Sequence, residues 1–218
     1  KFFKVFLLII FTGLITSCIN NQSMKPEDFK DQKPRLIIEE YLSGNVKAWG
    51  ILQNRSGKVT RQFSADLDGK WDGKQLILDE KFIWNDGEIQ NRQWVIDKID
   101  EHNYEGTAGD VVGKARGYSY GPAFKFEYVL LVPVKGKNIK ITFDDWIFMQ
   151  DERVAINRAK MTKFGIKVAE LTVRKKNWNW LMKPKEQGNF MKKPSLPKKM
   201  KLKRSKKAYN KLSLLCQQ

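Results

Sequence analysis

The sequence has very little histidine and cysteine, and this scarcity removes several classes of active site. His102 is the only histidine among 218 residues, so an ordinary zinc site built on several imidazoles is excluded. It also lies in a predicted turn, Asp100–Asn103, with no evident Ser-His-Asp arrangement around it. The two cysteines are Cys18 and Cys216. We therefore predict no catalytic residue, no metal site and no cofactor.

The sequence also lacks an apolar segment long enough to cross a membrane as a helix. Its longest apolar run near the N-terminus, Val5–Ile15, spans 11 residues, whereas a transmembrane helix needs about 20. This run follows Lys1 and Lys4 and precedes Ile15-Thr16-Ser17-Cys18. A positive flank, a short apolar core and small residues before a cysteine are typical of a lipoprotein signal peptide. We predict that residues 1–17 are the signal and that Cys18 is lipidated.

Lipidation of Cys18 has consequences for location and for disulfides. Ile19, rather than aspartate, follows the cysteine, which favours the outer membrane, facing the periplasm. The predicted partner of the protein is thus the membrane, through its acyl chains. Cys216 then has no partner within the chain, so the fold must be stable without a disulfide.

The net charge of +17 is unevenly distributed. From Arg174 onward there are 15 Lys and Arg residues and one acid, Glu186, which leaves a charge of only +3 for residues 1–173. The chain is therefore divided into a tether (18–33), a folded domain (34–174) and a basic tail (175–218) that is predicted to be disordered. Because the protein is predicted to be exported, we expect no nucleic-acid partner.

Hydrophobic residues alternate with polar ones across most of the domain, which indicates β-strands. Turn sequences such as Asp86-Gly87 separate these segments. About ten short strands and no long helix predict an all-β fold, an antiparallel lipocalin-like barrel, with an orthogonal β-sandwich as the alternative. The predicted strands are 46–53, 58–68, 75–84, 91–99, 103–108, 112–120, 123–134, 138–149, 152–161 and 166–174.

Three ionisable residues fall on otherwise apolar strand rows, namely Arg61, Arg92 and Asp145. An unpaired buried charge costs several kcal/mol, so we predict that the three converge in one partly buried cluster. One interpretation is an internal Arg–Asp ion pair with a purely structural role. The other is a ligand site, in which an arginine binds a lipid headgroup or a fatty-acid carboxylate. Trp94 and Tyr128 would then line an apolar pocket, whereas in the alternative interpretation they belong only to the core.

Several motifs occur in a characteristic order along the chain. They are Lys47-Ala48-Trp49-Gly50, Tyr104-Glu105-Gly106-Thr107-Ala108, Asp110–Gly117, Phe143-Asp144-Asp145-Trp146 and Lys163-Phe164-Gly165-Ile166. Together they resemble the bacterial lipoprotein family catalogued as domain of unknown function 3833, and the resemblance extends to about Val173. It implies an envelope lipoprotein without established activity. It also implies a link to membrane-lipid chemistry, because genes of this family often neighbour genes similar to cyclopropane-fatty-acid synthase and flavin oxidoreductases.

Together these features predict a membrane-anchored lipoprotein whose barrel binds or handles a lipid or fatty acyl ligand. One alternative is a structural envelope protein without a ligand, which a barrel filled by side chains would favour. Another is an enzyme that acts on acyl lipids, for which the sequence offers only Asp144, Asp145 and the arginines.

Overall fold

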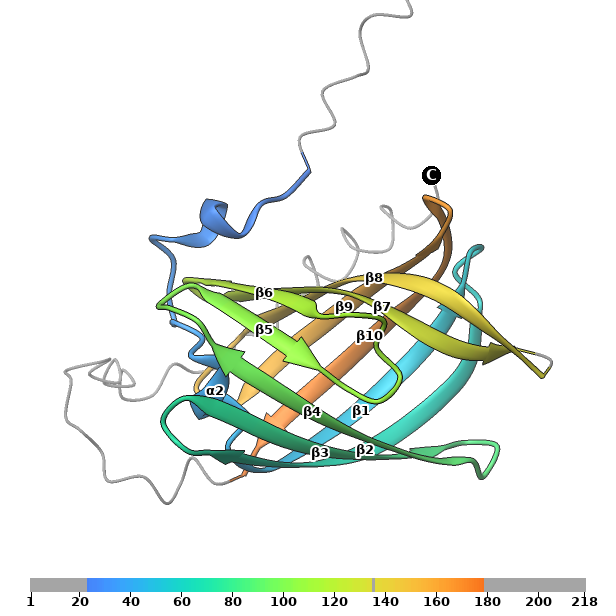
Figure 1. Ribbon diagram of the computed structural model, residues 1–218, viewed down its shortest axis with the longest axis horizontal. Coiled ribbons are helices and arrows are strands. Elements are labelled where there is room, and N and C mark those ends of the chain that lie inside the picture. Colours follow the sequence, from blue (N-terminus) through green and yellow to red (C-terminus); the bar gives the residue numbers. More distant parts are fainter. Residues whose placement is uncertain (1–22, 135, 179–218) are drawn as a thin grey trace, which may run out of the picture. The chain divides into compact units, whose positions relative to one another are not determined.

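The fold is a closed antiparallel β-barrel of ten strands, seen in a computed structural model that describes residues 23–134 and 136–178 (Figure 1). Each strand pairs with its neighbours in sequence, and β1 pairs with β10 to close the barrel. The prediction of a barrel is confirmed, and the sandwich alternative is not adopted. The strands are β1 (Gly44–Asn54), β2 (Val59–Trp71), β3 (Gln75–Trp84), β4 (Ile89–Lys98), β5 (Asn103–Thr107), β6 (Ala115–Tyr120), β7 (Ala123–Val134), β8 (Lys137–Met149), β9 (Val154–Lys163) and β10 (Ile166–Asn177).

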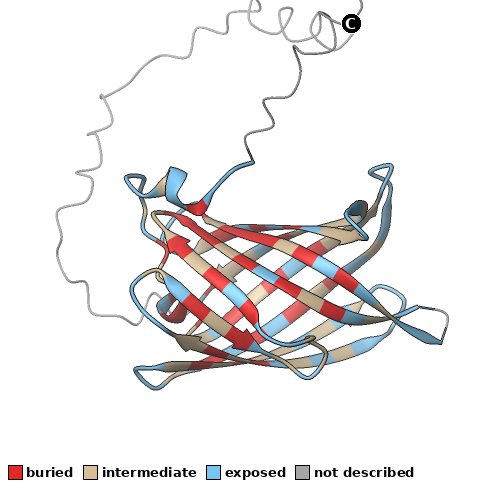
Figure 2. Cartoon of the chain, turned by 45° about the horizontal axis from the view of Figure 1, so that its top comes forward, coloured by how far each residue is buried: buried red, intermediate tan, exposed pale blue. Residues whose placement is uncertain are grey.

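Alternation along the strands explains why these segments form one barrel. Figure 2 shows buried and exposed positions alternating along most strands. In β2, for example, Phe63, Ala65 and Leu67 are buried, whereas Asp66 between them is exposed. Because successive strand side chains point to opposite faces, one row fills the interior and the other meets solvent. Among the described residues, no helix is long and apolar enough to span a membrane.

The segment before β1 covers one end of the barrel. It contains the short helices η2 (Pro26–Phe29) and α2 (Ile38–Tyr41), and α2 lies against the end of the barrel at the left of Figure 1. Leu36, Ile38, Tyr41 and Leu42 are each at most 3% exposed. The Leu36 amide donates to the Gly121 carbonyl (2.8 Å). This segment completes the core, although its sequence has no hydrophobic periodicity that would predict it.

Glu39 is the one acidic residue of α2 that is buried, at 4% exposure. Its carboxylate accepts hydrogen bonds from the ammonium of Lys98 (2.5 Å) and from the Tyr104 hydroxyl (2.9 Å). Two partners thus compensate the cost of its desolvation. Gly69 permits the close approach of this segment, because a Cβ there would lie 2.0 Å from the Leu42 carbonyl oxygen.

Several predicted strand boundaries differ from the observed ones by one to three residues, and two of these differences change the description of the domain. The predicted strand 112–120 begins only at Ala115, because the preceding residues form a loop with a single bridge from Val111 to Leu130. The domain does not end at Arg174, since β10 continues to Asn177. Lys175 pairs there with Ala48 of β1 and with Ala155 of β9. The lysine-rich composition of the tail obscured these last strand residues.

The corrected boundary predicts different outcomes for two truncations. A chain that stops after Trp178 should unfold cooperatively with an unchanged midpoint. A chain that stops after Arg174 loses residues paired on both sides and should be destabilised by roughly 3 kcal/mol, because each backbone hydrogen bond contributes about 1 kcal/mol. Urea unfolding monitored by circular dichroism measures the midpoint and the free energy of unfolding of both chains. Equal midpoints for the two chains would contradict the observed end of β10.

Candidate functional site: a polar cavity inside the barrel

The barrel encloses a cavity of about 80 Å³. Four of the five residues predicted to form a ligand site contribute to its lining, namely Arg92, Trp94, Tyr128 and Asp145. Trp94 packs edge-on against the Tyr128 ring, with their ring centroids 5.3 Å apart. Apolar side chains from β1, β2, β3, β7 and β10 form most of the remaining wall. Cys18, the predicted lipidation site, lies outside the described residues.

Asp145 is the most enclosed carboxylate of the cavity, with 9% exposure. It lies on the inner row of β8 and accepts hydrogen bonds from the Tyr128 hydroxyl (3.1 Å) and from the Asn157 side-chain amide. Asn157 also donates to the Trp146 carbonyl (3.0 Å). Burial raises the pKa of Asp145, although these hydrogen bonds and the charge of Lys175 act in the opposite direction.

Glu80 is a second carboxylate in the cavity that the sequence analysis missed. It lies on β3 between the inward residues Leu78 and Phe82, and its side chain is 10% exposed. Burial raises the pKa of Glu80, whereas Arg92 and Lys175 lower it. Alternation alone does not single out Glu80, because each row of this strand mixes apolar and charged residues. The inward row holds Leu76, Leu78, Glu80 and Phe82, and the outward row holds Ile77, Asp79, Lys81 and Ile83.

Arg92, which was predicted to share a cluster with Arg61 and Asp145, pairs with Asp110 and not with Asp145. Its guanidinium binds both carboxylate oxygens of Asp110, with Nη2 2.7 Å from Oδ2 and Nε 3.1 Å from Oδ1. Nη1 lies 3.8 Å from Glu80 Oε2. Asp110 lies in the loop between β5 and β6. The backbone amide of Leu131 in β7 donates to the Asp110 carbonyl (2.9 Å), and this hydrogen bond holds the loop in place. Strand periodicity could not identify a partner from a loop.

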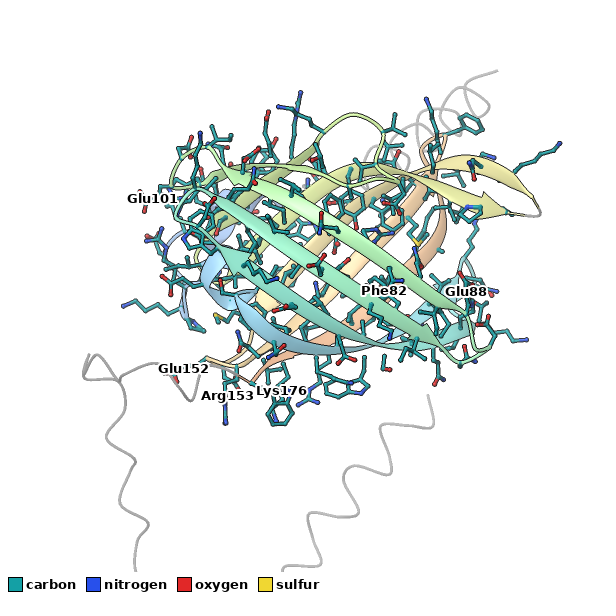
Figure 3. The ribbon with its side chains drawn as sticks, turned by 60° about the horizontal axis from the view of Figure 1, so that its bottom comes forward. Phe82, Glu88, Glu101, Glu152, Arg153 and Lys176 are labelled. Atoms are coloured by element: carbon teal, nitrogen blue, oxygen red, sulfur yellow. The ribbon has the colours of Figure 1, made fainter. Side chains whose placement is uncertain are left out.

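Arg61 lies apart from this cluster, which corrects the prediction of a single site. Its Nη2 contacts Asp86 (2.7 Å) and Glu88 (2.8 Å) of the β3–β4 turn, and its guanidinium lies 4.1 Å above the centre of the Trp84 ring. In Figure 3, Glu88 lies toward the hairpin end of the barrel, away from Glu101 at the other end. Asp86 and Glu88 of this turn thus provide the negative charge for Arg61 that we expected from Asp145.

Lys175 provides the second cation in the cavity lining. It was predicted to belong to the tail, but it is an inward residue of β10 whose charge lowers the pKa values of Asp145 and Glu80. No hydrogen bond or ion pair within 4 Å is found for its ammonium group among the described residues. Three carboxylates, those of Glu80, Asp110 and Asp145, therefore lie near two cations, Arg92 and Lys175. Arg92 forms an ion pair with Asp110.

This charge balance determines which ligand groups the cavity suits. Arg92 is engaged by Asp110, and Lys175 lies near enough to Asp145 and Glu80 to lower their pKa values. Both cations thus already have carboxylate neighbours, with which a carboxylate ligand would have to compete. An uncharged polar group or a cation would instead meet carboxylates with raised pKa values, a tyrosine hydroxyl and an amide. The cavity is smaller than the roughly 300–1,000 Å³ of small-molecule pockets. It therefore has room for a polar group, whereas an attached chain must extend beyond the cavity, toward the end of the barrel opposite α2.

The structure offers no support for a catalytic pair of Asp144 and Asp145. Asp144 lies on the outer face of β8, where it accepts from the Trp146 indole nitrogen (3.0 Å) and approaches Lys125 (3.6 Å). The barrel wall therefore separates the two carboxylates. Within residues 23–134 and 136–178, no group of three or more His, Cys, Asp or Glu side chains is arranged to hold a metal ion.

Comparison with known proteins identifies the family. The family model described as a protein of unknown function (DUF3833) matches residues 12–177. The chain belongs to this family. The match ends at the last residue of β10, beyond the expected limit near Val173, and so includes Lys175.

Other comparisons are more distant. A crystal structure of a protein with unknown function from the DUF3598 family of Nostoc punctiforme is similar with a TM-score of 0.48 and 12% identity, over 67% of this chain and 50% of that chain. The present chain thus spans about half the length of that protein. No curated protein sequence matches significantly.

The contacts of Asp145 predict the effect of Asp145→Asn. An asparagine can accept from Asn157 and donate to the Tyr128 oxygen, so the substitution should cost less than about 1.5 kcal/mol, the net value of a typical hydrogen bond. The 3–5 kcal/mol expected for a broken buried ion pair does not apply. Urea unfolding of wild type and Asp145→Asn at pH 4 to 8 measures the difference in the free energy of unfolding.

The same variant has a predicted pH dependence. Because the folded pKa of Asp145 is raised, its stabilising contribution is present below the ordinary carboxyl pKa and is lost as pH rises through the folded value. Wild type should therefore lose stability relative to Asp145→Asn as pH rises, by at most about 1.4 kcal/mol per pH unit. A stability difference that does not vary with pH would contradict a perturbed pKa.

Proposed function

We propose that this protein is a lipid-anchored protein of the bacterial cell envelope whose barrel binds the polar end of an amphipathic lipid. The observation that carries the proposal is the convergence of Asp145, Glu80, Tyr128 and Lys175 on one internal cavity. Replacing buried ionic groups by apolar ones often leaves stability unchanged or increases it, so a purely structural barrel has little need of them. The proposed ligand has an uncharged or cationic polar group, for example an ester or hydroxyl.

The apolar surroundings of the cavity support a lipid rather than a small polar metabolite. In and beside the cavity wall, partly buried apolar side chains pack against the core. An acyl chain directed toward the end of the barrel opposite α2 would contact apolar surface, and its burial would stabilise the complex by about 0.8 kcal/mol per CH₂. The residues concerned are Phe82, Trp84, Val132, Ile139, Met161 and Leu171.

A structural envelope protein without a ligand is the second candidate, favoured by the small volume of the cavity. Native mass spectrometry of protein purified from its own membranes distinguishes a lipid-binding barrel from a structural protein without a ligand. Wild type should retain a lipid. Ala48→Ile, which adds bulk at the cavity wall, should reduce retention roughly tenfold, since overpacking costs about 1–3 kcal/mol.

A control variant makes the comparison specific. Ser64→Ile adds a similar volume on the outer face of β2 and should leave lipid retention unchanged. If wild type carries no lipid, or if both variants retain it equally, the cavity is not a lipid site and the structural role is favoured.

The proposed location depends on Cys18, which the sequence predicts to carry the anchor in the outer membrane. Cys18→Ser should abolish labelling by palmitate analogues and release the protein from the membrane fraction. Cys216→Ser, the matched control at the other cysteine, should change neither the labelling nor the membrane association. Continued labelling of Cys18→Ser would show that the anchor assignment is wrong.

A further inference from the structure

Two neighbouring hairpins extend from the end of the barrel opposite α2. They are the β7–β8 and β9–β10 hairpins, and both lie at the right of Figure 1. They are adjacent because β8 pairs with β9, with Thr142 opposite Thr162. We refer to residues 131–140 and 160–169, without the undescribed residue 135, as the hairpin surface.

The hairpin surface exposes large apolar side chains. Phe164 is 93% exposed and Ile166 is 56% exposed, both in the β9–β10 hairpin. Leu131, Val134 and Val168 are each between 36% and 41% exposed. Exposed apolar side chains concentrated in the hairpins at one end of a barrel point to an interaction site, whereas single exposed apolar residues need no explanation.

Phe164 is also held in an unfavourable backbone conformation. Lys163 pairs with Ile166, so the hairpin loop has two residues, Phe164 and Gly165, with φ values of 51° and 77°. Loops with positive φ at both positions strongly favour Asn, Asp or Gly, because a side chain with a Cβ is strained there. A bulky aromatic that is both strained and unburied contributes nothing evident to folding, which points to a role outside the barrel.

The charge of the hairpin surface has one sign. Neither 131–140 nor 160–169 contains an aspartate or glutamate, whereas both contain several lysines. The Lys163 ammonium lies 5.4 Å from the centre of the Phe164 ring, and Lys167 contacts Glu170, just beyond this surface. The described lysines of the surface are Lys137, Lys140, Lys160, Lys163 and Lys167.

We propose that the hairpin surface docks on an anionic lipid bilayer, with Phe164 inserted at the interface and the lysines near the lipid phosphates. Aromatic and aliphatic side chains flanked by lysines match the apolar and anionic layers of such a surface. The surface would hold the hairpin end of the barrel against the membrane. Docking itself requires neither the Cys18 anchor nor a bound lipid. If the proposed function is also correct, this orientation gives a lipid a direct path into the barrel.

Site-specific fluorescence tests the proposal in the full chain carrying Cys18→Ser and Cys216→Ser. In this background, Phe164→Cys is labelled with an environment-sensitive fluorophore, and Glu101→Cys, on the opposite end of the barrel (Figure 3), provides the control. With phosphatidylglycerol-containing vesicles, the label at position 164 should shift to the blue and be quenched by nitroxide lipids. The label at position 101 should show neither change, and phosphatidylcholine vesicles should affect neither label.

Phe164→Gly provides a second test that separates docking from folding. Glycine relieves the positive-φ strain, so the melting temperature should stay equal or rise. Vesicle affinity should fall roughly tenfold, as expected for loss of one buried aromatic side chain. The proposal is overturned if the label at position 164 stays in water while the protein binds vesicles, because another segment then makes the contact. A shift of that label without vesicles, on self-association, would assign the surface to a second copy instead.

Discussion

The antiparallel pairing of β1 with β10 is the contact on which the rest of the structure depends. It joins Val46–Asn54 to Ala169–Asn177 and removes both edges of the sheet. Once the sheet is closed, one face of every strand is shut off from water, so every charged residue on that face needs a partner inside or at a rim. It also places Lys175, near the end of the last strand, beside the cavity.

Closure leaves the two ends of the barrel chemically different. At one end, α2 inserts apolar side chains and satisfies its buried Glu39 with Lys98 and Tyr104. At the other end, the hairpins expose Phe164 and lysines, and Arg61 is neutralised by the β3–β4 turn. The carboxylates of the cavity lie between these two ends. This polarity supports entry from the hairpin end, where the proposed membrane contact also lies.

The sequence predicted the strands and the inward rows well, because alternation follows directly from burial on one face. It placed Arg92, Trp94, Tyr128 and Asp145 around one space without any structural information. It failed on partners, because Asp86, Glu88 and Asp110 come from turns and a loop whose paths no periodicity defines. It missed Lys175 because the lysine-rich composition that follows masked the end of β10. It missed Glu80 because both rows of β3 mix apolar and charged residues, so periodicity does not define the inward face.

The central claim is that the cavity carboxylates receive the uncharged or cationic polar end of a lipid. Carboxyl ¹³C chemical shifts of Asp145 and Glu80, followed by NMR while a neutral monoacylglycerol or oleate is added, test it most directly. The account predicts that both carboxyls titrate above their ordinary pKa and that the monoacylglycerol perturbs their shifts at lower concentration than oleate. Shifts that titrate normally and respond to neither lipid would contradict it.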